Sequence, residues 1–360
     1  MCGRQFACQE SGRNPPVINQ RQRTRWVLDI FNTKLSGPSA ERLARKDSLQ
    51  FRILREIASP FHGTSGSYLR PTYSDVARKL GIDEETVRVR VIQAQRGGSV
   101  LGWRLAINPR LLGRQTTSVL LDIDDPSSKP SMVSQIKLID EVVLIMDFYE
   151  KPLRVVFCHE NDRDRERRLD LIKSVCGDKK PVSWQVVFAP CNARLKRTDW
   201  QILKVLRRDL MQDNLGIANE VRVSARTVRR RLAFMTKERA IYTFAMGNVA
   251  RMPGVTHFFL VKCTNEKKRE VDEKILSRLE NAVFVDNRDK QFSSYAAVFH
   301  NMGEADEAYR WIKGLDGVES VRILIMREII SVQDWFDKEI DRQLDTSGRR
   351  KVLPYLSKAN

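Results

Sequence analysis

The residues of this sequence whose types and spacing best suit chemistry are arginines in the segment 222–231. Arg222, Arg226 and Arg230 lie four positions apart, a spacing at which side chains of a helix are neighbours, and Arg229 directly precedes Arg230. Guanidinium groups bind phosphates and the edges of guanine bases equally well. The cluster therefore indicates a surface that binds a polyanion.

Residue patterns typical of catalysis and of metal binding are missing. The sequence has no P-loop, no GxSxG, no HExxH and no paired metal carboxylates. Its six cysteines are scattered without a CxxC pair, and we expect them to be reduced thiols. We predict that the protein is not an enzyme and that it holds no cofactor and no metal.

The net charge of +18 is unevenly distributed along the chain. Residues 1–46 carry +6, residues 47–107 carry +3 and residues 191–245 carry +8. The segments 108–190 and 246–330 are neutral, and the last thirty residues carry only +1. A solvated surface would spread its charge, so this localisation is the electrostatic footprint of nucleic-acid binding.

An internal repeat includes the arginine cluster. The hexamer TVRVRV at residues 86–91 returns as TVRRRL at residues 227–232, an offset of 141. Residues 74–103 align with residues 215–244 at the same offset. Upstream the offset is 149, which places eight additional residues of the first copy in the loop SPFHGTSGSYLRP, rich in Gly, Ser and Pro. The chain therefore holds two copies of a unit of about 140 residues.

Each copy opens with the pattern of a helix-turn-helix, because apolar residues at helical spacing predict three short helices. In the first copy Gly81 ends the second helix, Asp83 caps the third, and Gly97 and its neighbour end it. The following SVLGWRLAI predicts the strands of a wing. In the second copy Ser224 takes the cap, and Arg222 replaces the turn glycine.

The second part of each copy alternates strands and helices in the order β-α-β-β-α-β, which predicts a ferredoxin-like sandwich. We predict an α+β protein with two winged helix-turn-helix domains, each followed by a ferredoxin-like domain. The predicted boundaries are a basic N-terminal arm at 1–46, winged helix-turn-helix domains at 47–107 and 191–245, ferredoxin-like domains at 108–190 and 246–330, and a C-terminal helix and tail at 331–360.

The two ends of the sequence have their own patterns. The first residues are basic but contain no apolar segment of a secretory signal, so we expect a flexible arm. No apolar run approaches the ~20 residues that cross a bilayer, and we expect a cytoplasmic protein without membrane contact. In the last helix Trp335, Phe336 and Ile340 share one side, but the sequence does not name their partner.

This order of parts resembles the Lrp/AsnC, or feast/famine, family of transcription regulators. The resemblance covers about residues 47–330 and implies a helix-turn-helix that continues through a strand into a ferredoxin-like effector and assembly domain. The matching positions are Val76, Ala77, Thr86, Val87, Arg90, Val91, Gly98 and Val100 in the first copy and Ile217, Ala218, Thr227, Val228, Arg231, Leu232 and Ile241 in the second.

Two features bear on what the resemblance implies. The family typically has a glycine between the second and third strands of the sandwich, where small effectors bind, but FYEKPLR at 148–154 and NRDKQFSS at 287–294 contain none. We assign no effector residues, and a small-molecule effector stays open. Sirohaem decarboxylases share the architecture and use histidines in the sandwich. Here His159 and His300 occupy matching strand ends, where we expect local hydrogen bonds.

A helical projection assigns roles to the second copy. With Val228 and Leu232 on the buried side, Arg226 and Arg230 point outward next to Thr227, since each residue turns the helix by ~100°. Arg229 lies to one side, where it meets a phosphate, and Arg222 lies in the turn. Arg231 falls near the buried edge, which favours a structural or a backbone-contact role over the reading of a base.

The same projection places Glu85, Val89 and Gln93 outward in the first copy, with Thr86 and Arg88 at the sides. Glu85 is repelled by phosphate and accepts only from cytosine, Val89 suits a thymine methyl, and Gln93 suits adenine. The second copy is thus expected to bind DNA strongly. The first is either a sequence discriminator or a mostly structural head.

We predict a sequence-specific transcription regulator that binds double-stranded DNA. A non-specific architectural DNA-binding protein is the alternative, and a sirohaem-decarboxylase-like enzyme is a weaker one. The two copies are expected to pair internally through their sandwiches, which presents two unlike heads to an asymmetric site. Further self-association through the ferredoxin-like domains stays open.

Overall fold

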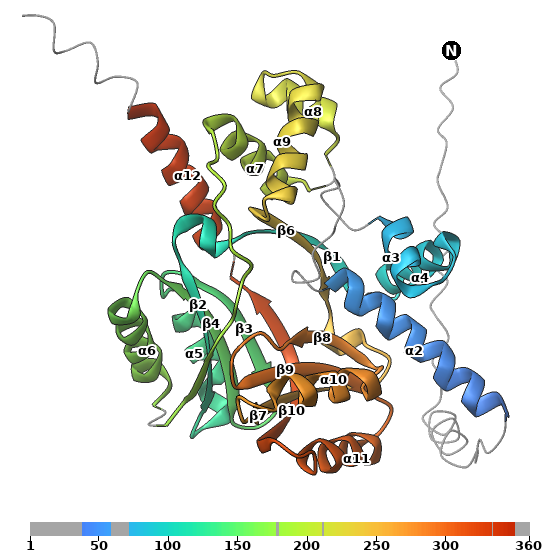
Figure 1. The fold of residues 1–360 in the computed structure, drawn as a ribbon. Helices are drawn as coiled ribbons and strands as arrows, with labels where there is room; N and C mark the ends of the chain where they lie inside the picture. The colour runs from blue at the N-terminus through green and yellow to red at the C-terminus, as the bar shows by residue number, and fades with distance from the viewer. Residues whose placement is uncertain (1–37, 59–71, 178–179, 211, 333, 350–360) are drawn as a thin grey trace, which may run out of the picture. The chain divides into compact units, whose positions relative to one another are not determined.

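The computed structural model describes residues 38–58, 72–177, 180–210, 212–332 and 334–349 (Figure 1). The chain divides into two compact units, Met1–Lys46 and Asp47–Asn360. Most of the predicted N-terminal arm and the predicted loop at 59–71 lie outside the described residues. Helix α2 (Pro38–Ala58) begins before the predicted boundary at residue 47, so the last part of the predicted arm is helical.

The first helix trio consists of α2, α3 (Tyr73–Leu80) and α4 (Glu84–Arg96). The predicted caps are confirmed. Gly81 ends α3 in the left-handed region with φ 67°, and the Asp83 carboxylate accepts the Thr86 N–H at 2.7 Å. Val87 and Val91 of α4 are fully buried against Ile53 of α2, so the predicted apolar stripe forms the core of this trio.

The second helix trio consists of α7 (Arg197–Arg208), α8 (Asn214–Val221) and α9 (Ala225–Lys237). The Ser224 hydroxyl caps α9 by accepting the Thr227 N–H at 3.1 Å. The C-terminal helix α12 (Asp334–Arg349) packs on α7, so α7 is the partner that the sequence did not name. Ile340 is buried in the core of this trio, and Arg207 of α7 pairs with Asp337 at 2.9 Å.

The strands after the helix trios differ from the prediction. Strand β1 (Val100–Ile107) does not fold into a hairpin wing but pairs with β6 (Ile241–Gly247), its counterpart in the other copy, as an antiparallel two-stranded ribbon. The prediction of strand hairpins directly after α4 and α9 was therefore wrong. A hairpin folded within these eight residues could pair only two very short strands, whereas the ribbon pairs β1 with β6 from Val100 to Ile107.

The remaining strands form one eight-stranded sheet in the order β5-β2-β4-β3-β10-β7-β9-β8. Each half follows the predicted β-α-β-β-α-β succession. The first half consists of β2 (Gln115–Asp122), α5 (Lys129–Ile136), β3 (Val142–Phe148), β4 (Pro152–His159), α6 (Asp162–Cys176) and β5 (Val182–Gln185). The second half consists of β7 (Val255–Cys263), α10 (Lys268–Arg278), β8 (Ala282–Asp286), β9 (Phe292–Phe299), α11 (Met302–Lys313) and β10 (Val318–Ser331). Short 3₁₀ helices Pro109–Leu112, Pro126–Ser128 and Val249–Arg251 precede β2, α5 and β7.

The long strand β10 joins the two halves. Its first part, Val318–Ile325, pairs with β7, and its last part, Met326–Ser331, pairs with β3 of the other copy. A register shift separates Met326 from Glu328 at the change of copy. The two copies therefore pair internally, through the β1–β6 ribbon and through the sheet.

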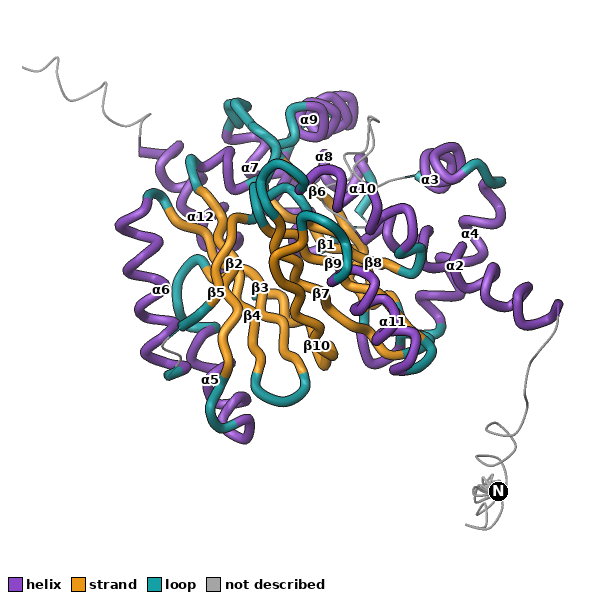
Figure 2. Tube along the Cα trace, turned by 60° about the horizontal axis from the view of Figure 1, so that its bottom comes forward, coloured by secondary structure: helices purple, strands orange, loops and turns teal. Residues whose placement is uncertain are grey.

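Alternation along the strands places two cores on opposite faces of the sheet. Val119 and Leu121 of β2 pack with α5 and α6, and the corresponding residues of β7 pack with α10 and α11. Figure 2 shows these helices beside the strands of their own half. Leu120 of β2 and Phe258 of β7 belong instead to a core that includes Ala245 of β6 and the first helix trio. The opposite face of the sheet is thus turned toward the β1–β6 ribbon.

Candidate nucleic-acid interface

Helix α9 turns an apolar side inward and an arginine-rich side outward. Val228, Leu232 and Met235 are buried, as the projection predicted. The side chains of Arg222, Arg226, Arg229 and Arg230 are exposed. Among the described residues, no carboxylate pairs with any of these four arginines. The second trio therefore presents four guanidinium groups whose hydrogen-bond donors face solvent.

Arg231 differs from its neighbours because it belongs to the trio's interior. It donates two hydrogen bonds of 2.5 Å to Asp199, whose side chain is 0 % exposed, and it stacks over Phe234. The hydrogen bonds raise the pKa of Arg231 further above its usual range. The predicted structural role of Arg231 is confirmed.

Arg222 occupies the turn between α8 and α9 in a left-handed conformation, with φ 58° and ψ 49°. A non-glycine residue costs about 1–2 kcal/mol there, because its Cβ crowds the following carbonyl. The counterpart in the first copy is Gly81, for which the conformation costs little. The exposed Arg222 is therefore held in the turn before α9 at a cost in backbone energy.

Helix α4 presents a different outer side. Arg88 donates two hydrogen bonds to Glu85, at 2.6 Å from Nε and 2.5 Å from Nη2. These bonds lower the pKa of Glu85 and raise that of Arg88. The arginine that aligns with Arg229 is thus paired within its own helix, so the first trio offers little free positive charge at this position.

The other predicted residues of the first copy lie where the projection places them. Val89 is 37 % exposed, and Gln93 is exposed one turn later. Thr86 is half-buried, and its hydroxyl donates at 2.5 Å to the Asp83 carboxylate, which is the cap of the helix. Thr227 in α9 is similarly half-buried, with its hydroxyl 3.0 Å from that of Ser224. Both threonines therefore serve their helix caps.

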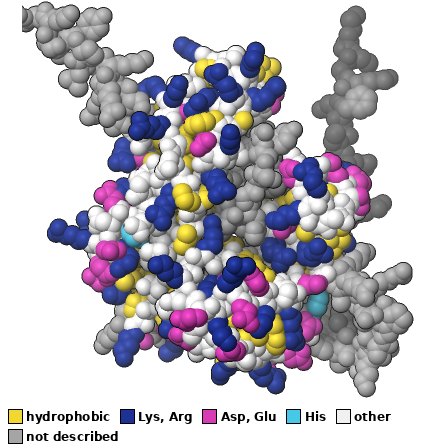
Figure 3. All heavy atoms as spheres, in the orientation of Figure 1, with side chains coloured by type: hydrophobic (Ala, Val, Ile, Leu, Met, Phe, Trp, Pro, Cys, Tyr) yellow, Lys and Arg dark blue, Asp and Glu magenta, His cyan; other side chains and the backbone are white. Residues whose placement is uncertain are grey.

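The surface view agrees with this contrast between the trios. Figure 3 shows Lys and Arg side chains over the region of α8 and α9 with few acidic ones, whereas the region of α3 and α4 mixes both signs. The net charge of the sequence agrees with this view, since residues 191–245 carry 13 Lys and Arg against 5 Asp and Glu.

The loop that follows the second strand of each sandwich half is fastened from inside by a lysine. Lys129 is buried, and its ammonium donates to the Asp147 carboxylate at 3.0 Å and to the carbonyls of Phe148 and Pro152 at 2.7 and 2.9 Å. Lys268, 139 residues later, donates to the carbonyl of Asn287 at 3.0 Å. Both loops lack the glycine that is typical of Lrp/AsnC regulators. In each loop a backbone carbonyl accepts a hydrogen bond from a lysine of the protein itself.

The histidines and cysteines take part in packing and local hydrogen bonds. His159 is buried with Nε2 2.9 Å from the Thr117 hydroxyl and Nδ1 3.3 Å from the Asn161 carbonyl. His300 is exposed at the matching position. The four cysteines in the described part of the chain are buried and form no disulfide, and no group of three potential metal-ligating side chains occurs there. None of the described helices is long and apolar enough to cross a bilayer.

Sequence reasoning did not find a buried polar group inside the molecule. Arg154 of β4, Asp286 of β8 and Arg104 of β1 line one internal cavity. A charged residue inside an apolar strand, as in LRVVF and VFVDN, could have indicated a buried charge. The sequence could not show that these strands meet.

Some known proteins resemble this chain in sequence or in fold. No protein-family model matches the chain. Over 97 residues the chain is 34 % identical to the HTH-type transcriptional regulator Ptr1 of Methanocaldococcus jannaschii, a match that covers 27 % of this chain and 60 % of that relative. E. coli AsnC is 18 % identical, with a TM-score of 0.26 over 41 % of this chain and 96 % of that chain. The match to Ptr1 supports the predicted resemblance to transcription regulators with a helix-turn-helix over that part of the chain.

A solved structure shares the fold over most of the chain. The siroheme decarboxylase NirDL has a TM-score of 0.50 at 15 % identity, and the match covers 84 % of this chain and 99 % of that chain. At this identity the likeness concerns the fold alone. It agrees with the observed α+β architecture of helices and antiparallel sheet.

Proposed function

We propose that this chain is a cytoplasmic, sequence-specific transcription regulator that binds double-stranded DNA through two unlike helix-turn-helix heads. Residues 47–107 would form the first head and residues 191–245 the second, while the segments 108–190 and 246–330 form the ferredoxin-like domains that join them. The relative named as a transcriptional regulator supports DNA binding. Sequence specificity and the roles of individual residues are part of the proposal.

The observation that carries the proposal is the difference between two aligned helices. Helix α9 exposes Arg226, Arg229 and Arg230 without a carboxylate partner among the described residues, whereas Arg88 of α4 is paired with Glu85. Phosphate binding needs guanidinium groups that are free to exchange water for phosphate oxygens. The second head therefore supplies most of the affinity for DNA.

Within the second head, position on the helix divides the work. Arg226 and Arg230 lie four residues apart on the outward side and are placed to reach base edges in the major groove. Arg229 lies to the side and Arg222 lies before the helix, so both are assigned to the phosphates that flank the groove. In the first head, Val89 and Gln93 supply weaker apolar and amide contacts to bases.

The internal pairing of the copies determines the form of the DNA site. A homodimer with two equal heads reads a palindrome, because its symmetry repeats in the DNA. Here the β1–β6 ribbon joins two heads that differ at Glu85 and Arg226, the same repeat position. One chain is therefore expected to protect an asymmetric site, and further self-association would add such sites side by side.

The test is a salt titration of binding to duplex DNA with Arg229→Ala and its matched control Arg88→Ala. Each phosphate contact contributes about −0.9 to the slope of log affinity against log salt. Arg229→Ala should weaken binding to every sequence and flatten this slope by about one unit, while Arg88→Ala should change it much less. A collapse of binding with Arg88→Ala alone would contradict the assignment of the binding head.

Specificity is tested with Arg230→Ala on two duplexes, the region upstream of the protein's own gene and a random sequence. If Arg230 binds a base, its loss should cost about 1–3 kcal/mol on the specific duplex and little on the random one. Equal affinity of the unaltered protein for both duplexes would favour the non-specific architectural alternative.

The fold of NirDL favours a second candidate, a decarboxylase that acts on a tetrapyrrole. The internal cavity fits this candidate poorly, since it measures ≈ 210 Å³, is mainly apolar and is lined by a carboxylate. The substrate of such an enzyme is a tetrapyrrole with several carboxylates, which is larger than this cavity, and Asp286 opposes the attraction that the two arginines would exert on those carboxylates. An absorbance titration with sirohaem decides between the two, because a stoichiometric Soret shift on binding would support the enzyme.

A further inference from the structure

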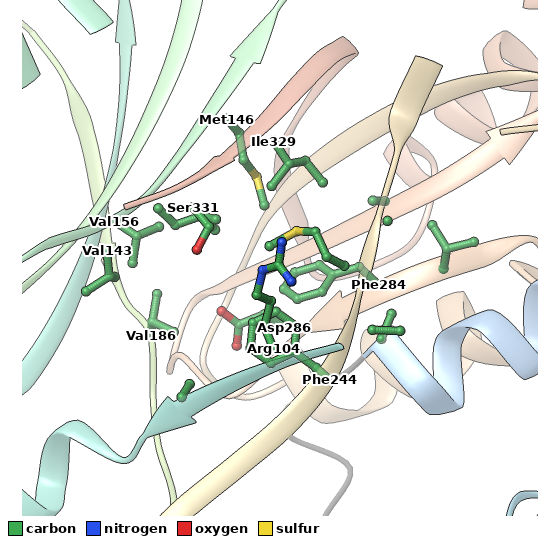
Figure 4. A pocket seen from close by; sticks show the side chains of 18 of the residues that line it. Arg104, Val143, Met146, Val156, Val186, Phe244, Phe284, Asp286, Ile329 and Ser331 are labelled. Atoms are coloured by element: carbon green, nitrogen blue, oxygen red, sulfur yellow. The ribbon is translucent and has the colours of Figure 1, made fainter. Parts of the chain in front are cut away.

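A cavity of ≈ 210 Å³ lies between the β1–β6 ribbon and the eight-stranded sheet. Its lining is mostly apolar and comes from both copies, with Phe244 from β6, Met146 from β3, and Phe284 and Ile329 from β8 and β10 (Figure 4). An apolar cavity of about 150 Å³ already accepts a benzene ring. The space therefore suits a molecule with one ring or of similar size.

Asp286 is the polar group that makes this cavity unusual. Its side chain lines the cavity, the residue is only 3 % exposed, and neither carboxylate oxygen accepts a hydrogen bond. The backbone N–H of Arg288 lies near enough to lower the pKa of this carboxyl, but it completes no hydrogen bond to either oxygen. A buried carboxylate without a donor is costly, so this group is suited to receive a donor from a ligand.

Two guanidinium groups share the cavity with Asp286. Arg154 is fully buried over the Trp184 and Phe258 rings, and its Nε donates to the Ser118 hydroxyl at 2.7 Å. Arg104 extends from β1 into the cavity (Figure 4). Burial raises the pKa of Asp286, while the charges of Arg154 and Arg288 oppose this shift. The polar end of the cavity thus combines one acceptor with positive charge.

This combination selects the chemistry of a ligand. An ammonium group would donate to Asp286 but would be repelled by both guanidinium groups. A carboxylate would be attracted by the guanidinium groups, but on Asp286 it would place a second negative charge and would donate no hydrogen bond. A hydroxyl group can donate to the carboxylate while its lone pairs face the arginines. We propose that the cavity binds a small apolar molecule with one hydroxyl group, of the phenol or cyclic alcohol class, with its hydroxyl on Asp286.

The place of the cavity links it to the heads. Strand β1 follows α4 and β6 follows α9, and both strands line the cavity. A ligand held there would change the position of the ribbon that carries both heads and, with it, the affinity for DNA. This consequence rests on the proposed function. The binding site itself does not depend on DNA binding.

The experiment compares four probes of one size, p-cresol, toluene, benzoate and benzylamine, by calorimetry and thermal unfolding of the full chain. p-Cresol should bind roughly tenfold more tightly than toluene, because a hydrogen bond to a charged group adds to the same apolar contact. Benzoate and benzylamine should bind more weakly than p-cresol. Absence of binding by all four probes, or tightest binding of either charged probe, would overturn the site.

Two variants locate the hydroxyl contact. Asp286→Leu should bind p-cresol and toluene equally, and Asp286→Asn, which keeps a weaker acceptor and the side-chain size, should lose most of the tenfold preference. An undiminished preference in Asp286→Asn would overturn the contact even if Asp286→Leu does not fold.

A DNA titration with p-cresol then tests the link to the heads. Binding of p-cresol without a change in DNA affinity would support the site and overturn the link. Absence of DNA binding by the unliganded chain would overturn the proposed function and leave the site supported.

Discussion

Arg231 of α9 is joined to Asp199 of α7 by two parallel hydrogen bonds of 2.5 Å. Asp199 also accepts the backbone N–H of Lys196 at 2.6 Å, so one carboxylate caps α7 and holds α9 against it. Arg90, at the matching place in the first copy, donates to Gln50 of α2 at 3.5 Å. In both trios an arginine of the third helix thus contacts the first helix.

The Arg231–Asp199 pair leads to the first prediction. Arg231→Ala leaves the Asp199 carboxylate buried without its cation, and breaking a buried pair in this way costs about 3–5 kcal/mol. The free energy of unfolding, measured by urea denaturation, should fall by that amount. The adjacent control Arg230→Ala removes an exposed side chain and should change stability by less than about 0.5 kcal/mol. Similar losses for both variants would contradict the structural role.

The second prediction concerns the pair that neutralises the first head. Glu85→Gln should release Arg88 for phosphate and strengthen binding to random duplex DNA at low salt, with a slope steeper by about 0.9. Glu84→Gln is the matched control, because it removes the same charge from the exposed first turn of α4 without releasing Arg88. If both variants strengthen binding equally, net charge alone explains the effect.

The third prediction concerns Arg222 and Gly81, which end α8 and α3 in the left-handed conformation. Arg222→Gly should raise the free energy of unfolding by up to about 1 kcal/mol, because glycine adopts φ 58° without a Cβ. Gly81→Ala should lower it by about 1 kcal/mol through backbone strain alone, since an added Cβ meets nothing within 4 Å. DNA affinity should fall in Arg222→Gly despite its greater stability. An unchanged affinity would remove Arg222 from the interface.

The fourth prediction follows from the burial of His159, which lowers its pKa below the usual 6.5. The unfolded chain binds a proton at this residue first as the pH falls, so the contribution of His159 to stability is complete above pH 6.5 and is lost below it. The difference in unfolding free energy between the unaltered protein and His159→Gln should therefore be constant near pH 8 and shrink toward pH 5. A difference that grows on acidification would contradict this burial effect.

Local patterns predicted the helices of both heads with little loss. Gly81, Asp83 and Ser224 act on backbone groups within three or four residues of themselves, so their effect is visible in the sequence. The outward positions of Arg226, Arg229 and Arg230 follow from the same helical period. Their assignment to DNA contacts stays a prediction, since position alone does not identify the partner.

The pairing of strands escaped prediction because it joins segments far apart in the chain. SVLGWRLAI reads as a hairpin when only neighbouring residues are considered, yet Trp103 pairs with Ala245, 142 positions later. The start of α2 at Pro38 was missed as well, because the basic composition that predicted an arm does not oppose a helix.

The sequence by itself determined the duplication, the helix caps, the succession of strands and the side of each helix that carries charge. All of these depend on contacts within a few residues or on a comparison of two segments. Only the tertiary structure decided that α12 covers α7 and that Arg104, Arg154 and Asp286 meet in one cavity. These outcomes depend on side-chain rotamers and on the partners chosen by strand edges, which are selected by the free energy of the whole fold and leave no mark on local residue patterns.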